Sequence, residues 1–150
     1  MKMSKIKNEK GVSLVFVIIV LLVLSLLSTA VFTLFVSNMR TAQLQENTTR
    51  AHYIAISGVE LTFASLTTGT SSTRLLKTYF DKPISESVSP LTQTVNLDGG
   101  TAEVNVSSYI ESGNRWVKIT SIGTLNDGTN VSRTIEMKFR VEYPEIQVWS

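Results

Sequence analysis

The chain has 150 residues, a formal net charge of +2 and no cysteine. This length leaves room for one small domain beside a membrane segment, and the lack of cysteine excludes disulfides and thiolate metal sites. The charge is uneven, because residues 1–11 contain four lysines and one glutamate (+3), whereas the remainder is −1. The remainder therefore lacks the basic signature of a nucleic-acid-binding domain.

An apolar run covers residues 12–36, and no charged residue lies between Lys10 and Arg40. Of its 25 residues, 19 are Leu, Ile, Val or Phe, which favours insertion into a bilayer by about 6–11 kcal/mol. As a helix the run would be about 37 Å long, enough to cross a hydrocarbon core of about 30 Å. Four lysines before the run and only Arg40 just behind it predict a single-pass protein of the cytoplasmic membrane, with its N-terminus in the cytoplasm and its C-terminal domain outside.

Two general interpretations apply to a basic stretch followed by an apolar run. A secretory signal peptide would be cut after Ser28-Thr29-Ala30, which has the required small-x-small spacing. The apolar run continues beyond that point to Val36, which argues against this interpretation. An uncleaved signal anchor would leave Met1 in place.

A third interpretation rests on Lys10-Gly11-Val12-Ser13-Leu14, where a short charged leader ends in glycine and meets the apolar run directly. This arrangement resembles the type IV prepilin cleavage site. The resemblance implies that a prepilin peptidase cuts between Gly11 and Val12 and that the new amine of Val12 is methylated. Glycine suits the position because it allows the backbone to lie extended in a protease site.

The helix is expected to continue beyond the membrane, from Val12 to about Leu66, because no proline occurs between Val12 and Lys82. Residues 37–66 form an amphipathic continuation, and residues 67–73 supply a stop signal. The face expected to be buried holds Leu44, Ala51, Ile54, Ala55, Gly58, Val59, Thr62 and Leu66. The solvated side is expected to hold Arg40, Gln43, Gln45, Asn47 and Arg50. Small residues at 51, 55 and 58 would allow a sheet to approach the helix closely.

Residues 67–92 are rich in Ser and Thr and are expected to connect the helix to a sheet, with Leu75-Leu76 and Tyr79-Phe80 as anchors. Alternating apolar residues then predict four antiparallel strands within residues 93–150. Turn signals separate these strands at Asp98-Gly99-Gly100, Gly113-Asn114 and Asn126-Asp127-Gly128. The inward residues of the last strand are Ile135, Met137, Phe139, Val141 and Tyr143, and Pro144 ends it.

These elements predict an α+β fold in which a long N-terminal helix packs on an antiparallel β-meander. The sheet has one apolar face, and the amphipathic half of the helix is the sizeable element that can cover it. The expected divisions are a leader (1–11), a membrane or filament-core helix (12–36), its amphipathic continuation (37–66), a connection (67–92) and the sheet (93–150).

This architecture resembles that of type IV pilins, most closely the PilX-type minor pilins and the K-type tip pseudopilins. The specific similarity lies in the cleavage-site motif and in Ala51-His52-Tyr53-Ile54-Ala55-Ile56-Ser57-Gly58-Val59-Glu60. The resemblance implies assembly into a type IV pilus-like or secretion filament, with other pilin subunits and an assembly platform as partners. Phe16 stands where most of these proteins have glutamate, and tip pseudopilins also lack it, so the substitution indicates a minor, priming role.

The sequence offers no catalytic residues and implies no cofactor or metal. One histidine and no cysteine exclude Cys/His catalysis and most zinc sites, so we expect no enzyme. His52 is interpreted as a half-exposed helix residue, and Asp98 and Asp127 as turn residues rather than calcium ligands. A different kind of protein also fits these features, namely a membrane-anchored extracellular binding domain unrelated to filaments.

Overall fold

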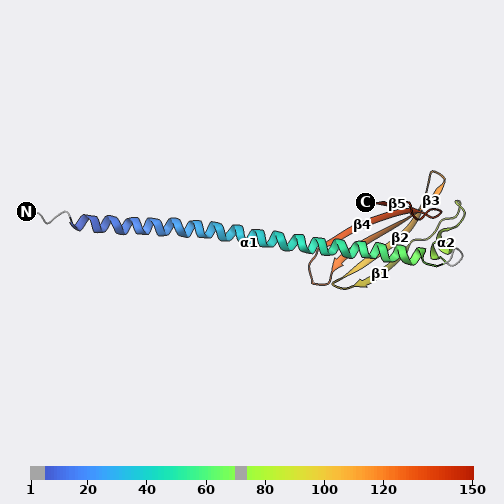
Figure 1. The fold of residues 1–150 in the computed structure, drawn as a ribbon, viewed down its shortest axis with the longest axis horizontal. Helices are drawn as coiled ribbons and strands as arrows, with labels where there is room; N and C mark the ends of the chain where they lie inside the picture. The colour runs from blue at the N-terminus through green and yellow to red at the C-terminus, as the bar shows by residue number, and fades with distance from the viewer. Residues whose placement is uncertain (1–5, 70–73) are drawn as a thin grey trace, which may run out of the picture. The chain divides into compact units, whose positions relative to one another are not determined.

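The computed structural model describes the backbone of residues 6–69 and 74–150, and side chains from Ser13 onward within those ranges. The chain divides into two compact units, one ending at Leu44 and the other comprising Gln45–Ser150. Helix α1 (Ile6–Thr67) is uninterrupted, and the short helix α2 (Leu75–Phe80) follows it (Figure 1). Helix α1 begins upstream of the expected start and ends within one residue of the expected end. The proposed stop residues 70–73 lie outside the described residues.

Five strands form one antiparallel sheet in the order β1-β2-β3-β4-β5, so each strand pairs with its neighbours in the chain (Figure 1). The strands are β1 (Leu91–Leu97), β2 (Gly100–Glu111), β3 (Asn114–Leu125), β4 (Ser132–Arg140) and β5 (Gln147–Trp149). The α+β layout with a long N-terminal helix and a C-terminal antiparallel sheet is confirmed. The expectation of four strands is wrong, because β5 pairs with Met137–Phe139 of β4.

The turns between strands lie at glycines that the sequence analysis singled out, but one turn is displaced by one residue from its predicted position. Asp98 and Gly99 join β1 to β2 as expected. The next turn consists of Ser112 and Gly113, whose φ angles are 52° and 75°, as a type I′ turn requires at both central positions. The prediction of a turn at Gly113-Asn114 was therefore wrong by one residue, because Asn114 already belongs to β3 and pairs with Glu111.

The end of β4 also differs from the expected pattern. The strand stops at Arg140, and the chain bends at residues 141–142. Val141 stays buried, whereas Tyr143 is 47% exposed rather than directed into the core. Side-chain alternation depends on an extended backbone, so it predicts nothing beyond the bend.

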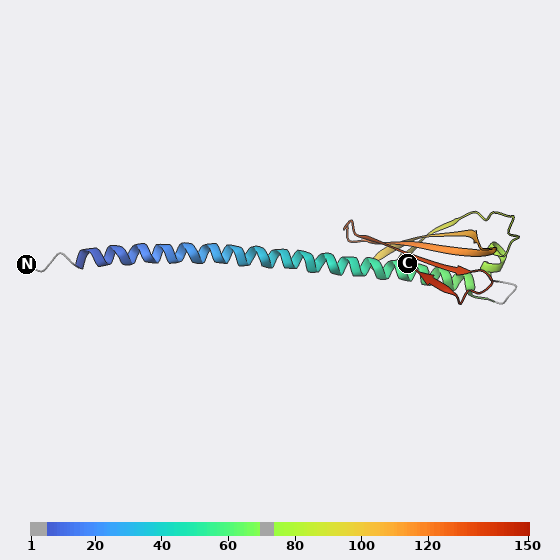
Figure 2. The same cartoon turned by 90° about the horizontal axis from the view of Figure 1, so that it is seen from above.

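The C-terminal part of α1 and the sheet form two layers, with the helix on one face of the sheet (Figure 2). The buried helix residues are Asn47, Ala51, Ile54, Ala55, Gly58, Val59 and Leu66. Leu44 was expected among them but is 58% exposed, whereas Asn47 was expected in solvent and is only 9% exposed. Asn47 precedes Ala51 by one helical turn and shares its face. Its place on the helix, rather than the polarity of its side chain, therefore determines its burial.

Small residues set the distance between helix and sheet. A Cβ added to Gly58 would stand 2.5 Å from Ser121 Oγ and 2.7 Å from Ala102 Cβ. A Cβ on Gly123 would meet the backbone oxygen of Ala51 and come within 2.6 Å of the backbone nitrogen of Ala55. A side chain at either position would therefore collide with the opposite layer, so both layers have glycine at this contact.

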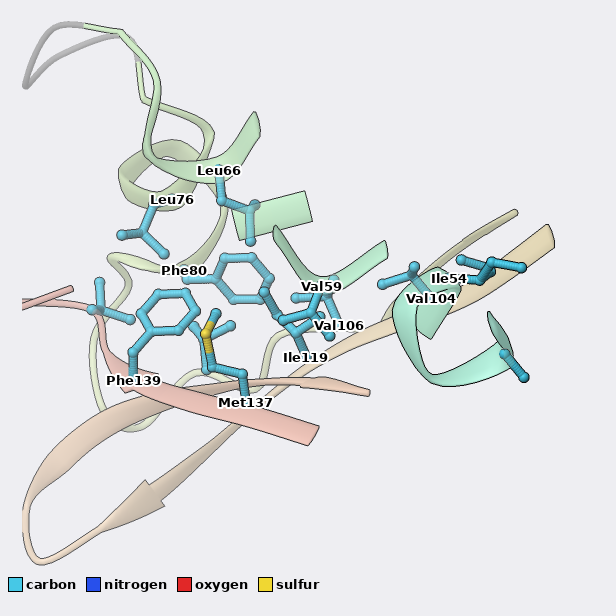
Figure 3. Close-up of a cluster of buried hydrophobic side chains, with 14 of the residues drawn as sticks. Ile54, Val59, Leu66, Leu76, Phe80, Val104, Val106, Ile119, Met137 and Phe139 are labelled. Atoms are coloured by element: carbon cyan, nitrogen blue, oxygen red, sulfur yellow. The ribbon is translucent and has the colours of Figure 1, made fainter. Parts of the chain in front are cut away.

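The core lies between these layers and extends under α2 (Figure 3). Its largest fully buried side chains include Leu76 and Phe80 of α2, Ile119 of β3, and Met137 and Phe139 of β4. Phe63 of α1 meets Phe139 edge to face, with ring centroids 5.0 Å apart and planes at 86°, an arrangement that adds about 0.5–1.5 kcal/mol beyond area burial. Of the four expected anchors in the connection, Leu76 and Phe80 are buried and Leu75 and Tyr79 are exposed.

Candidate functional site: the apolar half of α1

The first part of α1 presents an apolar surface in every direction. Every side chain from Ser13 to Phe35 is exposed, and none of them carries a charge. A helix without polar faces is stable when surrounded by lipid or by other apolar helices. Within the described residues, α1 is the one helix long and apolar enough to cross a membrane.

Three of the hydroxyl groups in this segment donate hydrogen bonds within the helix. Ser25 Oγ donates to the carbonyl of Leu22 at 2.8 Å, Thr29 Oγ1 to Ser25 at 2.9 Å, and Thr33 Oγ1 to Thr29 at 2.9 Å. Because each donor already has an acceptor, these side chains add little cost in an environment without water. The three residues recur at intervals of four and therefore lie on one face.

The residues predicted for processing lie near the start of α1. The backbone of Gly11 and Val12 is helical, and their side chains lie outside the described residues. Phe16 follows in the apolar segment and is 67% exposed. Between Ser13 and Val36 no side chain carries a charge, so this part of the helix offers no carboxylate to pair with an amine.

The second motif of the sequence analysis, residues 51–60, contains the residues that pack most closely on the sheet. Ala51, Ala55 and Val59 are fully buried, and Gly58 sits over Ser121. Outside this face, His52 is half-buried and Glu60 is exposed. The spacing of small residues predicted this contact correctly, although it did not reveal the small residues Ala102, Ser121 and Gly123 that receive the helix.

The acidic side chains singled out in the sequence lie in turns. Asp127 Oδ1 accepts hydrogen bonds from the hydroxyl and the backbone N–H of Thr129, at 2.6 and 3.0 Å. The hydrogen bond from the hydroxyl of Thr129 is the main reason why the pKa of Asp127 lies below its ordinary value of 3.8, and the hydrogen bond from the backbone N–H of Thr129 is the second. Among the described residues, no three His, Cys, Asp or Glu side chains are grouped as a metal site would require.

An arginine that the sequence analysis missed organises the end of the domain near α2. Arg115 Nη2 donates to the carbonyl oxygens of Pro83 and Glu86, both at 2.7 Å, and its Nη1 donates to Ser108 Oγ at 3.3 Å. Lys82 and Glu86 form an ion pair at 2.8 Å in the same loop. A single guanidinium thus joins two backbone carbonyl oxygens of this loop to strand β3.

Together these features define an α+β protein whose N-terminal helix combines an exposed apolar segment with a segment packed on an antiparallel sheet. No family model, curated protein or solved structure matches the chain.

Proposed function

We propose that the chain is a minor pilin or pseudopilin subunit of a type IV pilus-like or type II secretion-like filament, acting in assembly or at the tip. The observation that supports this best is the continuity of α1 from Ile6 to Thr67. An apolar segment passes without a helix break into the segment that covers the sheet. A simple anchor needs no such continuity, because a flexible linker would connect it to its domain equally well.

Processing at Gly11 comes first in this proposal. A prepilin peptidase cuts between Gly11 and Val12, and the new amine of Val12 is methylated. The backbone at Gly11 is helical before cleavage, so the leader must unwind locally for the peptide bond to enter a protease site. Glycine lowers the cost of that unwinding, because it destabilises a helix by about 1 kcal/mol relative to alanine.

Assembly then moves the apolar segment from lipid to protein. Residues 12–36 hold the subunit in the cytoplasmic membrane until the assembly platform extracts it. In the filament, the apolar helices of neighbouring subunits replace the lipid, so the segment never meets water. The hydroxyl face formed by Ser25, Thr29 and Thr33 is narrow and provides a position for close helix packing.

Phe16 supports a minor role rather than that of a major shaft subunit. A carboxylate at this depth costs about 2.5–3.5 kcal/mol to insert, and the family tolerates it because it pairs with the N-terminal amine of a neighbouring subunit. Phe16 cannot form this pair. A subunit at the tip has no neighbour above it and does not require one.

Intact mass and N-terminal sequencing of the mature chain test the proposal directly. A pilin-like subunit starts at Val12 with a methylated amine, a secreted domain starts at Val31, and an anchored binding domain retains Met1. The variant Gly11→Ala should block cleavage and keep the protein out of sheared surface fractions, whereas Ser13→Ala, just beyond the cut, should be processed normally. Normal processing of Gly11→Ala would rule out the assigned cleavage site.

A further inference from the structure

A pocket lies where three segments that are distant in the sequence come together. Its lining comes from α2 and the loop after it (within 77–84), from the end of the β2–β3 turn and the start of β3 (113–115), and from the end of β4 and the bend behind it (140–142). This α2 pocket has a volume of about 360 Å³, and small-ligand sites typically have about 300–1,000 Å³. It therefore has room for a small organic group.

Basic residues outnumber acidic residues in the lining of the α2 pocket. The basic residues are Lys77, Lys82, Arg115 and Arg140, and the acidic residues are Asp81 and Glu142. The lining thus has a formal charge of +2, whereas residues 12–150 together have a charge of −1. Positive charge around a concave surface raises the local concentration of anions.

Part of this positive charge has no counter-ion within the described part of the chain. Lys82 already belongs to an ion pair, and the guanidinium of Arg140 lies 5.2 Å from the ring centroid of Trp116. Lys77 and Arg115 belong to neither of the two ion pairs that the structure describes. These two side chains can therefore compensate the charge of a ligand.

The environment of Arg115 favours an anion nearby. The side chain is half-buried, and the hydrogen bonds of its guanidinium reach neutral oxygens, namely backbone carbonyls of the loop and the hydroxyl of Ser108. Its Nε is buried and has no hydrogen-bond partner among the residues described. A charge that is partly withdrawn from water is stabilised by an opposite charge close to it. An anion in the α2 pocket would supply that charge.

Other residues of the lining restrict the kind of anion. Asp81 and Glu142 are exposed and would repel a second negative charge on the ligand. A singly charged carboxylate is therefore favoured over a doubly charged phosphate. Ile84 also lines the pocket and is 57% exposed, so it offers an apolar contact to a short stem that carries the carboxylate.

We propose that the α2 pocket binds a ligand with one carboxylate on a short aliphatic stem, the chemistry shared by a glutamate side chain and by short free acids. Lys77 and Arg115 compensate the charge of the carboxylate, and Ile84 contacts the stem. This binding is independent of the proposed function, because no residue of α1 lines the pocket.

Amide chemical shifts of the ¹⁵N-labelled full chain in zwitterionic micelles test this binding at constant pH and ionic strength. Butyrate and N-acetylglutamate N-methylamide supply the carboxylate, and butyramide and N-acetylglutamine N-methylamide are their neutral counterparts. We expect the carboxylate probes to shift the amides of Gly113, Asn114 and Glu142, and the neutral probes to leave them in place. Equal shifts with the neutral probes, or no shift with either carboxylate, would overturn the proposal.

The same titration distinguishes the two sources of the carboxylate. A response to butyrate as strong as that to the blocked glutamate supports a free short acid, whereas a response to the blocked glutamate alone supports a glutamate side chain of a peptide. Inorganic phosphate should bind more weakly than either. Tighter binding of phosphate would overturn the assignment of a singly charged ligand.

Two variants of exposed lining residues should change the affinity in opposite directions. Lys77→Gln removes a positive charge and should weaken binding of the carboxylate probes about two- to five-fold, whereas Glu142→Gln removes a negative charge and should strengthen it by a similar factor. Loss of structure cannot produce both effects. Lys138→Gln, on β4 and outside the lining, is the matched control and should leave the affinity unchanged. Weaker binding in Glu142→Gln, or equal effects of Lys77→Gln and Lys138→Gln, would contradict the assigned site.

Discussion

Gly58 of α1 lies directly over Ser121 of β3, so that a Cβ on Gly58 would stand 2.5 Å from the serine Oγ. Ser121 is fully buried, and its hydroxyl has no hydrogen-bond partner among the described residues. An unpaired buried hydroxyl costs about 1–3 kcal/mol. Close approach of helix and sheet is therefore maintained here at the expense of hydrogen bonding.

We expect Gly58→Ala to destabilise the domain by up to about 2 kcal/mol. The added methyl group overpacks the contact, which costs about 1–3 kcal/mol, and the gain in helix propensity offsets about 1 kcal/mol of this cost. Ala102 Cβ, 2.7 Å from the new atom, is fixed to the sheet and cannot rotate away. Thermal unfolding followed by near-ultraviolet circular dichroism measures the change.

The control is Ser65→Ala on the exposed side of the same helix, which should be neutral or slightly stabilising. Adding Ser121→Ala to Gly58→Ala should recover part of the lost stability, because one of the two close contacts disappears. A stabilised Gly58→Ala variant would contradict the close packing.

Arg115→Lys should loosen the loop between α2 and β1. The guanidinium donates from Nη2 to the carbonyls of Pro83 and Glu86, whereas an ammonium is a point donor without the planar fork. Losing charge-assisted hydrogen bonds of this kind costs about 1.5–3 kcal/mol each. A glutamate-specific protease should therefore cut at Glu86 several-fold faster in the variant. Arg133→Lys, on the exposed start of β4, should leave the rate unchanged; equal acceleration in both variants would refute a specific role for Arg115.

Thr129→Val should raise the pKa of Asp127. The threonine hydroxyl is the main group that lowers this pKa from 3.8, and the backbone N–H of the same residue is the second. Only the hydroxyl is removed, so the pKa in the variant should rise toward 3.8 and remain below it. Carboxyl carbon NMR across an acid titration measures the midpoint, and Thr134→Val on β4 serves as the control.

The sign of the associated stability change follows from linkage. A carboxyl group with a lowered folded-state pKa stabilises the fold above its unfolded pKa, and the contribution is lost as the pH falls through the folded-state value. As the pH falls below 3.8, the native protein should therefore lose the stability that ionised Asp127 contributes. The variant Thr129→Val has less of this stability to lose. Identical acid titrations of the two proteins would contradict the hydrogen bond.

Phe16→Glu should still insert into the membrane. The glutamate costs about 2.5–3.5 kcal/mol, whereas the apolar run favours insertion by about 6–11 kcal/mol. Extraction of membranes at alkaline pH should therefore leave both this variant and the control Phe16→Leu in the pellet. Release of Phe16→Glu into the supernatant would show that the apolar run favours membrane insertion by less free energy than its composition indicates.

Much of the fold could be predicted because it depends on local patterns. Nineteen aliphatic or Phe residues within a 25-residue run and the lack of proline predict a long helix, and α1 confirms it. The spacing of Ala51, Ala55 and Gly58 predicted the face that packs on the sheet. The alternation of apolar residues and the Asp98-Gly99 signal predicted the antiparallel hairpins.

Other features could not be predicted because they depend on partners distant in the sequence. Strand β5 has only three residues, and its pairing with β4 is what defines it. Arg115 looks like any polar strand residue until the fold brings the carbonyl oxygens of the loop within its reach. Asn47 carries a polar side chain, yet the packing of its helical turn buries it.

The sequence by itself determined that an apolar helix at residues 12–36 precedes a domain of alternating strands, since the first follows from an uninterrupted apolar run and the second from the alternation of side chains along the backbone. The tertiary structure alone decided how closely the two layers approach, because that distance depends on small residues from separate elements meeting at one place. It also decided that β1 remains an open edge, since pairing is a property of neighbours in space.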